Sequence, residues 1–391
     1  MRPEMEMILD GVLSGRLLSR EDAYHLIRSP EAHISALCRG AAALRDLGKG
    51  RRVSFSPKVF IPLTKLCRDF CSYCTFRESP QDARRLYMSP EEILAVARAG
   101  ERLGCGEALF TLGERPEQRY PEARAWLAQR GYKTTLEYLR AMCALILSET
   151  KLLPHSNPGT LSERELVALK DVNASMGLML ENISEDLHAP GGPHELAPSK
   201  RPQARLRTLE KAGRLKIPFT TGLLIGIGET LKSRVNTLYA IRDLNHRFGH
   251  IQEVIIQNFR AKPGTAMATQ VDPSSSDVKR TAAVARLILG ADANIQVPPN
   301  LSAADYPIYL SAGINDWGGI SPLTIDYVNP EAPWPQLSDL RQRSAEKGFT
   351  LRARLTVYPE FVTQKTDYLP EAIRPRLAAI ADAEGYLRGE W

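Results

Sequence analysis

Three cysteines, Cys67, Cys71 and Cys74, lie within one stretch of eight residues. A thiolate is a soft metal ligand, so three of them on a short loop can bind one metal centre. A structural zinc site normally has four protein ligands, whereas a catalytic centre keeps one position open for a small molecule. Cys105 and His155 are distant in sequence and unpaired, so no fourth ligand with zinc-like spacing is visible. These residues favour an iron–sulfur centre with an open site, and a zinc or redox-active thiol cluster is the alternative.

The cysteines follow an apolar segment that is typical of a strand, and similar segments recur along the chain. Each is followed by sequence with helical periodicity, which predicts βαβ units and a parallel sheet. About eight such units predict an α/β fold, a TIM-like (β/α) barrel whose polar strand ends share the face with the active site. We expect strands at residues 59–64, 107–112, 152–157, 174–180, 217–225, 251–257 and 293–297, and a last strand that ends at 312–316.

The 391 residues divide into a helical lead-in (1–50), the barrel (51–350) and a C-terminal extension packed on it (351–391). A composition of 43% apolar and 25% charged residues predicts a soluble globular protein. No apolar run approaches the roughly 18 residues of a membrane span, and the acidic N-terminus lacks the apolar core of a signal peptide. We therefore expect a cytoplasmic protein with no membrane partner, whose remaining cysteines are small buried side chains.

Positive charge is densest at residues 200–216, although the formal net charge of the chain is only +6. The simplest interpretation is a solvated helix face. Docking of an acidic electron donor is an alternative. Nucleic-acid binding is not expected, because no aromatic interleaving or binding motif accompanies the charge.

The cysteine loop resembles the cluster-binding loop of the radical S-adenosylmethionine (SAM) enzymes, C-x-x-x-C-x-aromatic-C. The resemblance implies that Cys67, Cys71 and Cys74 bind three irons of a [4Fe-4S] cluster, with the fourth iron open to SAM. Tyr73 takes the aromatic position. The longer sequence around the loop, FIPLTKLCRDFCSYCTFR, resembles that of the 7,8-didemethyl-8-hydroxy-5-deazariboflavin (FO) synthase subunit 1 family. This resemblance covers residues 50 to about 360, and the cysteine loop is its specific part.

Gly113 and Glu114 end the second expected strand. In isolation a glycine before a carboxylate is usually a turn. The resemblance makes them the family's G-G-E element, whose carboxylate accepts a hydrogen bond from the SAM amino group. Leu112 replaces the first glycine, which leaves the backbone contact there less defined than the role of Glu114.

Gly222, Gly226 and Glu229 match the family's G-x-I-x-G-x-x-E element, with Leu224 in place of isoleucine. Glycine lets the backbone approach an adenine ring closely because it has no Cβ atom. A phosphate-binding loop is the competing interpretation, but no Lys-Ser/Thr pair follows and the spacing differs from a P-loop. We expect these residues to bind SAM.

Further polar residues lie at the other strand ends. Glu181 closes the fourth strand, where relatives hold the SAM ribose, and Asn182 could serve equally because both side chains accept hydrogen bonds from hydroxyls. Asn258 ends the sixth strand and is expected to contact the cofactor. His155 and Asn157 are expected to face the same cavity from the third strand and to act on the substrate as candidate catalytic residues, although His155 could equally be a structural histidine.

Asp316 and Trp317 belong to a segment, residues 315–322, that resembles a late signature of the same family. The substrate that the resemblance implies contains a uracil ring with a ribityl chain and a hydroxybenzyl group. A uracil ring with a ribityl chain offers many neutral donors and acceptors. We expect both residues to contact the hydroxybenzyl or ribityl part of the substrate. A Trp-Gly-Gly turn that only closes the barrel is the alternative.

The resemblance implies a radical SAM lyase of coenzyme F(420) biosynthesis. SAM is cleaved to methionine and a 5′-deoxyadenosyl radical, which takes hydrogen from 5-amino-5-(4-hydroxybenzyl)-6-(D-ribitylimino)-5,6-dihydrouracil. Ring closure with loss of ammonia then gives FO, a deazaflavin. The implied partners are the companion FO synthase subunit 2, which would make this hydroxybenzyl-ribityl-uracil adduct, and a one-electron donor such as a ferredoxin or flavodoxin.

Three other functions stay open at this point. The chain could be the companion tyrosine-using 5-amino-6-(D-ribitylamino)uracil 4-hydroxybenzyl transferase, or a menaquinone-pathway relative of the same barrel. It could also be a metal-binding regulator without catalysis. That third function is disfavoured because a regulator has no need for Glu114 and Glu229 beside an open metal site.

Overall fold

The computed structural model describes residues 4–389 and 391, so residues 1–3 of the expected lead-in lie outside the described residues. Its centre is a closed barrel of eight parallel strands, and a ninth strand pairs with the first outside the barrel. The expected α/β, TIM-like (β/α) barrel is confirmed. The strands are β1 (Arg52–Thr64), β2 (Glu107–Leu112), β3 (Leu153–Asn157), β4 (Ser175–Gly177), β5 (Phe219–Ile225), β6 (Ile251–Asn258), β7 (Ile295–Gln296), β8 (Asp316–Ile320) and β9 (Thr350–Ala353).

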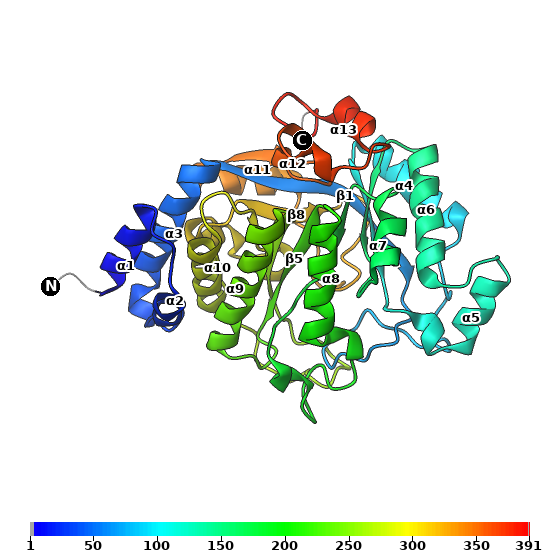
Figure 1. Ribbon diagram of the computed structural model, residues 1–391, viewed down its shortest axis with the longest axis horizontal. Helices are drawn as coiled ribbons and strands as arrows, with labels where there is room; N and C mark the ends of the chain where they lie inside the picture. Colours follow the sequence, from blue (N-terminus) through cyan, green and yellow to red (C-terminus); the bar gives the residue numbers. More distant parts are fainter. Residues whose placement is uncertain (1–3, 390) are drawn as a thin grey trace.

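Helices surround the barrel, and the three N-terminal ones form a separate layer at one side of it (Figure 1). From this layer, α3 (Ile34–Lys49) packs against α10 (Ser275–Leu289), and α2 (Arg20–Ile27) packs against α9 (Leu231–Phe248). No helix among the described residues has the length and apolar character to span a membrane. The α-helices are α1 (Glu4–Leu13), α2 (Arg20–Ile27), α3 (Ile34–Lys49), α4 (Pro90–Arg102), α5 (Pro121–Ala128), α6 (Thr135–Glu149), α7 (Glu163–Lys170), α8 (Pro202–Arg214), α9 (Leu231–Phe248), α10 (Ser275–Leu289), α11 (Leu337–Ala345), α12 (Pro359–Thr363) and α13 (Arg374–Ile380).

The start of α4 shows how the local sequence sets a helix boundary. The Ser89 hydroxyl accepts from the backbone N–H of Glu92 at 3.3 Å, and the Glu92 carboxylate accepts from the N–H of Ser89 at 2.8 Å. Pro90 occupies the first turn, where no backbone donor is needed. This capping box fixes where the chain turns away after the cysteine loop.

Strand β1 is longer than the expected 59–64 and begins at residue 52. Its first half carries polar side chains at alternate positions, so it lacks the continuous apolar run from which the strand at 59–64 was predicted. Ser54 donates to Asp316 at 2.5 Å and Ser56 donates to Glu107 at 2.6 Å, so these side chains enter a buried polar network. The strand pairs with β2, β8 and β9, and it therefore closes the barrel.

Strand β8 begins at Asp316, whereas the sequence predicted that a strand ends there. The Trp-Gly-Gly segment, for which a turn was one alternative, lies within this strand. Its glycines instead leave room for side chains of neighbouring strands. A Cβ atom on Gly319 would lie 2.4 Å from Cε of Lys58, and one on Gly318 would lie 2.0 Å from Nε2 of Gln296.

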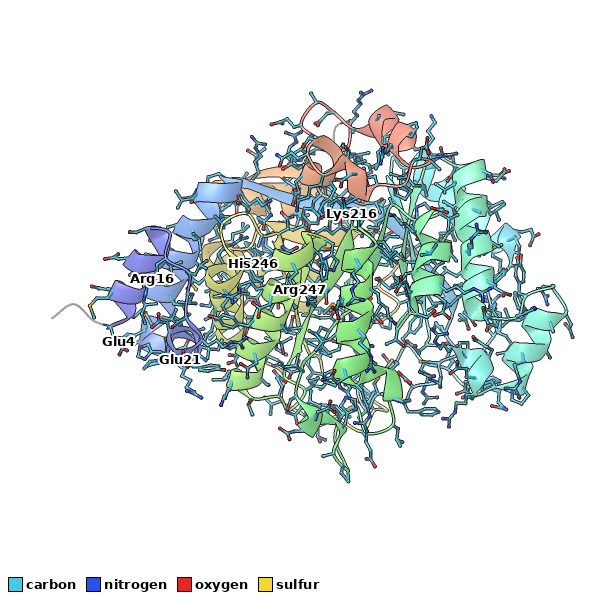
Figure 2. All side chains as sticks on the ribbon, in the orientation of Figure 1. Glu4, Arg16, Glu21, Lys216, His246 and Arg247 are labelled. Carbon is cyan, nitrogen blue, oxygen red and sulfur yellow. The ribbon has the colours of Figure 1, made fainter. Side chains whose placement is uncertain are left out.

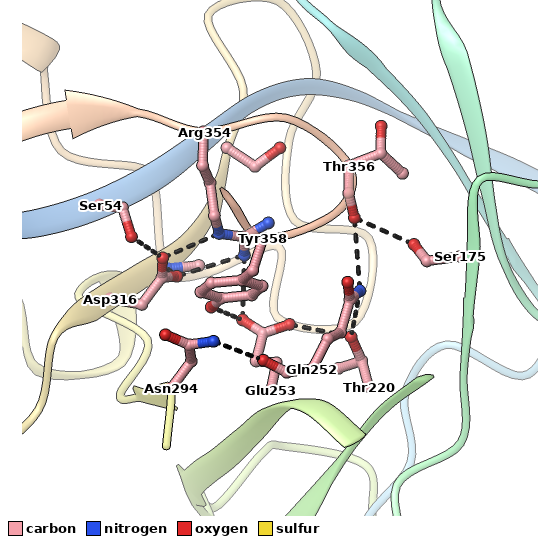
Figure 3. A network of polar contacts seen from close by, with 12 residues as sticks. Ser54, Ser175, Thr220, Gln252, Glu253, Asn294, Asp316, Arg354, Thr356 and Tyr358 are labelled. Carbon is pink, nitrogen blue, oxygen red and sulfur yellow. Dashed lines mark hydrogen bonds and ion pairs between the residues drawn. The ribbon is translucent and has the colours of Figure 1, made fainter. Parts of the chain in front are cut away.

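The segment after β9 crosses the amino ends of the barrel strands. Its Arg354 pairs with Asp316 of β8 at 2.8 Å and with Glu253 of β6 at 3.0 Å. Tyr358 donates to the same Glu253 at 3.0 Å, and Thr356 accepts from Ser175 through its carbonyl oxygen, also at 3.0 Å (Figure 3). The C-terminal segment thus closes this end of the barrel with polar contacts.

Candidate functional site

One cavity of about 390 Å³ runs from the carboxyl ends of the strands down to the polar network at their amino ends. This volume lies within the range of small-molecule sites. Its lining brings together side chains that are far apart in the sequence, among them Cys67, Glu114, His155, Glu181, Gln252 and Arg354.

Cys67, Cys71 and Cys74 all line this cavity, and all three are free thiols. Burial raises the pKa of Cys67 to about 12 and that of Cys71 to about 11, so metal binding must displace protons there. In the described part of the chain, no three His, Cys, Asp or Glu side chains are close enough to ligate one ion. An iron–sulfur cluster needs no such convergence, because each thiolate binds its own iron. Three free thiols in one cavity match the donor set of such a cluster.

The cysteine loop is held by contacts that the sequence did not reveal. The backbone N–H of Phe70 donates to the carbonyl oxygen of Leu196 at 2.9 Å. The guanidinium groups of Arg77 and Arg119 lie 3.9 and 4.0 Å from the centroid of the Phe70 ring. The loop is therefore anchored by a hydrogen bond to a segment more than 100 residues away and by two cation–π contacts to the Phe70 ring.

Glu114 faces the cavity from the end of β2 and is nearly buried. Its carboxylate accepts from the backbone N–H of Thr160 at 3.1 Å and from the Thr160 hydroxyl at 2.8 Å. Burial raises the pKa of Glu114. Two glycines make this arrangement possible, because a Cβ atom on Gly159 would lie 1.6 Å from the carboxylate and one on Gly113 would lie 2.0 Å from the carbonyl oxygen of Leu66. Thr160 is a positioning residue that the motif search missed.

Glu181 also lines the cavity, as expected, and its backbone is left-handed with φ 63°. Its carboxylate forms a close ion pair with Lys200 and lies 3.9 Å from Arg205. Both cations line the cavity near the cysteines. Asn182, by contrast, is 2% exposed, and its side-chain Oδ1 accepts from the backbone N–H of Ser184 at 2.9 Å. The position of Asn182 therefore does not support a ribose contact.

The glycine-rich loop after β5 is organised by its own glutamate. The Glu229 carboxylate accepts from the backbone N–H groups of Gly226 at 2.8 Å and Ile227 at 2.9 Å, and it pairs with Arg234 at 2.7 Å. Gly222 lies where β5 and β6 approach closely, because its Cβ atom would be 2.2 Å from a carbonyl oxygen of β6. Glu229 and the two glycines thus shape the backbone, and none of them lines the cavity. An adenine contact with this backbone stays a prediction.

His155 and Asn157 both line the cavity from β3. Nδ1 of His155 is 2.6 Å from the Ser175 hydroxyl, and Nε2 is 3.1 Å from Oδ1 of Asn157. Burial lowers the pKa of His155 to about 4, so the imidazole is neutral at neutral pH. Gly177 opposite leaves the space that both side chains use. Their contact with a substrate stays a prediction.

Tyr73 lines the cavity between two of the cysteines, and its hydroxyl is 2.9 Å from Nε2 of His194. It therefore ties the cysteine loop to the segment that contains His194.

Asn258, unlike Tyr73, lies outside the cavity. It is buried at the end of β6, donates to the carbonyl oxygen of Leu301 at 3.4 Å and does not line the cavity, so its position does not support the expected cofactor contact.

Asp316 and Trp317 have no exposed surface, and they lie at the amino end of β8 rather than at the face with the cofactor residues. Asp316 pairs with Arg354. The Trp317 indole N–H donates to Ser344 at 3.2 Å, and its ring packs edge-on against Tyr306. Neither residue lines the cavity, so their position does not support the expected contact with the substrate.

The basic stretch 200–216 does not form one continuous patch. Its first part turns toward the cavity, as described above. In its second part, Arg214 pairs with Glu210 at 2.9 Å and Lys216 pairs with Asp367 at 2.6 Å. Glu210 also pairs at 3.0 Å with Arg247 of α9, and the positions of Lys216 and Arg247 are labelled in Figure 2. The outer charges thus form exposed ion pairs, which agrees with a solvated helix face.

Sequence comparisons give the family. The Radical SAM superfamily profile matches residues 61–239. The chain is 51% identical over 336 residues to the 7,8-didemethyl-8-hydroxy-5-deazariboflavin synthase of Methanopyrus kandleri, covering 86% of this chain and 100% of that protein. It is 49% identical over 400 residues to the FO synthase of Streptomyces coelicolor, covering 100% of this chain and 46% of that protein. The chain thus spans about half the length of such FO synthases and the full length of the Methanopyrus protein.

Solved structures share the fold. The FeFe-hydrogenase maturase HydG from Carboxydothermus hydrogenoformans matches with a TM-score of 0.72 at 21% identity, covering 96% of this chain and 86% of that one. Methylornithine synthase matches with a TM-score of 0.68 at 18% identity, covering 88% and 97%. With the cysteine loop, the barrel and the relatives in agreement, the chain belongs to the 7,8-didemethyl-8-hydroxy-5-deazariboflavin synthase family within the radical SAM superfamily.

Proposed function

We propose that this protein converts 5-amino-5-(4-hydroxybenzyl)-6-(D-ribitylimino)-5,6-dihydrouracil to FO with loss of ammonia, and cleaves SAM to 5′-deoxyadenosine and methionine. The observation that carries the proposal is the convergence of three free thiols with Glu114 and Glu181 on one cavity. Membership of the FO synthase family supports the choice of substrate.

We propose that Cys67, Cys71 and Cys74 hold a [4Fe-4S] cluster with one iron open to SAM. When bound, the cluster supplies the electron that cleaves SAM. The chain itself orients the ligand. Glu114, fixed by Thr160, accepts from the ammonium group of the methionine part, and Glu181 accepts from ribose hydroxyls.

Lys200 and Arg205 extend this assignment to residues that the sequence motifs did not include. Both cations lie beside Glu181 and line the same cavity near the cysteines. A carboxylate is the natural counter-charge for a pair of cations in a partly buried site. We therefore assign them the carboxylate of the methionine part.

The partners and the setting follow from the same proposal. A companion enzyme must join tyrosine carbon atoms to a ribityl-diaminouracil to make the substrate, and we propose FO synthase subunit 2 for this step. A ferredoxin- or flavodoxin-like protein would supply single electrons. All six cysteines are free, which suits the reducing cytoplasm.

The test is anaerobic reconstitution with iron and sulfide, followed by SAM, a reductant and the hydroxybenzyl adduct, with products identified by mass. Formation of FO together with 5′-deoxyadenosine supports the proposal. Turnover of tyrosine with 5-amino-6-(D-ribitylamino)uracil in place of the adduct would assign the companion activity instead. Cluster binding without any SAM cleavage would favour a regulator.

A further inference from the structure

The cavity ends on a floor of charged and amide side chains, whereas barrel interiors are usually filled by branched apolar residues. Nζ of Lys58 lies 2.7 Å from the Glu107 carboxylate, and both side chains are nearly buried. A second pair, Arg354 and Glu253, lies at the same end of the barrel. Removing ion pairs from water has a large desolvation cost, so stability alone gives no reason for such a floor.

Gln252 gives the floor an unused hydrogen-bonding group. The residue is 1% exposed and lines the cavity. Its Nε2 donates to the hydroxyl of Thr220 and to the carbonyl oxygen of Thr356, both at 3.3 Å (Figure 3). Its Oε1 has no partner among the described residues. A buried carbonyl oxygen without a donor is unfavourable, and a ligand hydroxyl would satisfy it.

The glycines of β8 keep the floor open to the cavity. Gly319 lines the cavity, and a side chain there would meet Lys58. Gly318, with φ +77°, leaves the space that the Gln296 amide occupies. Lys58, Gln252 and Gln296 therefore reach the floor from β1, β6 and β7, and all three line the cavity.

The wall directly above the floor is apolar. Phe60 pairs in register with Leu109, one inward position above the pair Lys58 and Glu107. The Phe60 ring stacks on Trp334, with centroids 5.2 Å apart and planes at 12°. Phe60, Leu109 and Trp334 all line the cavity. The cavity thus has a cofactor end at the cysteines, an apolar wall and a polar floor.

We propose that the floor binds the ribityl chain of the substrate through Lys58, Gln252 and Gln296, while the apolar wall receives the rings. This inference rests on the proposed function, because it takes its substrate from there. The two cations of the floor, Lys58 and Arg354, are already paired with the carboxylates of Glu107, Glu253 and Asp316. A floor without excess positive charge suits an uncharged polyol rather than a phosphate. Its amides can both donate to and accept from hydroxyls.

The variants Gln252→Met and Gln296→Met test the inference, because each keeps the length of the side chain and removes its amide. FO and an analogue with a methyl group in place of the ribityl chain are titrated calorimetrically into reconstituted protein that holds methionine and 5′-deoxyadenosine. The wild type should bind FO at least about tenfold more tightly than the analogue. Each variant should lose most of this preference and bind the analogue within about twofold of the wild type. Gln129→Met, at an exposed position on the end of α5, should behave as the wild type.

Each other result has a distinct meaning. If a variant loses affinity for FO and for the analogue by the same factor, the floor is structural and the inference is wrong. If the wild type forms FO but binds both ligands equally, the inference is wrong while the proposed function stands. If the wild type neither forms nor binds FO, the proposed function fails, and the inference fails with it.

Discussion

The backbone N–H of Glu114 donates to Sγ of Cys67 at 3.2 Å. The two loops are joined again on either side of this contact. Arg68 donates its N–H to the carbonyl oxygen of Glu114 at 2.7 Å, and Gly113 donates its N–H to that of Thr64 at 3.0 Å. Glu114, proposed to bind the SAM ammonium, and Cys67, proposed as a cluster ligand, are therefore held by one stretch of hydrogen-bonded backbone. Hydrogen bonds to cysteine sulfur also tune cluster potentials.

Gly113→Ala should break this junction. The added methyl group would lie 2.0 Å from the carbonyl oxygen of Leu66, which belongs to the backbone and cannot rotate away. We expect the folded variant to retain little iron after reconstitution, as measured by iron and sulfide content. Gly106→Ala is the control, because its new methyl group meets only a flexible leucine side chain at 3.3 Å. Full iron content in Gly113→Ala would show that the loops are less tightly coupled than their contacts indicate.

Glu114→Gln should weaken SAM binding and leave the cluster in place. The substitution keeps the shape but replaces a charge-assisted hydrogen bond by a neutral one. We expect a loss of roughly 1.5–3 kcal/mol, or about 10- to 150-fold in affinity. Thr160→Val should have a smaller effect in the same direction, because it removes one of the two hydrogen bonds that position the carboxylate. SAM titration calorimetry measures both, and unchanged affinity in Glu114→Gln would remove this residue from the site.

The three loop cysteines should be individually essential for the cluster. Cys67→Ala, Cys71→Ala or Cys74→Ala each removes one of three iron ligands, so the brown visible absorbance and SAM cleavage should both be lost. Cys105→Ala and Cys143→Ala should keep both, because these thiols are buried away from the cavity. Loss of the cluster in a normally folded Cys105→Ala or Cys143→Ala protein would contradict the three-ligand assignment.

Local patterns in the sequence were sufficient to predict the barrel. The strand at 107–112 was predicted with the bounds that the structure shows, and Ser89, Pro90 and Glu92 marked the start of α4. Strand ends with polar residues also located Glu114, Glu181 and His155 on one cavity. These features depend on residues close in sequence, which is why a pattern search finds them.

The floor of the barrel could not be predicted because it depends on distant partners. Glu253 and Arg354 are about 100 residues apart and look like ordinary surface charges when taken alone. Strand β8 has the glycine content of a turn, and its glycines leave the space that the side chains of Lys58 and Gln296 occupy. Sequence propensity gives way there to packing that only the folded chain shows.

His155 should make the stability of the protein depend on pH. Its pKa is lowered by burial from 6.5 to about 4, so the unfolded chain binds a proton that the folded chain refuses between these values. The stability from this group is full above pH 6.5 and is lost as the pH falls toward 4, by an amount on the order of 3 kcal/mol. The melting temperature of His155→Gln should therefore fall less between pH 7 and pH 5 than that of the wild type. His246→Gln, at an exposed position, should follow the wild type, and equal slopes in all three would contradict the assignment.

Asp316→Asn separates a structural role from a role in substrate binding. Asp316 is fully buried, accepts from Ser54 at 2.5 Å and pairs with Arg354 at 2.8 Å. Neutralising one member of a buried ion pair costs roughly 3–5 kcal/mol, so the melting temperature should fall clearly below that of Asp171→Asn, an exposed control. Because the residue lies outside the cavity, the amount of FO formed per SAM cleaved should stay within about twofold of the wild-type ratio at a temperature where the variant is folded. A normal melting temperature with a steep fall in that ratio would return Asp316 to the substrate site and overturn its placement in the barrel floor.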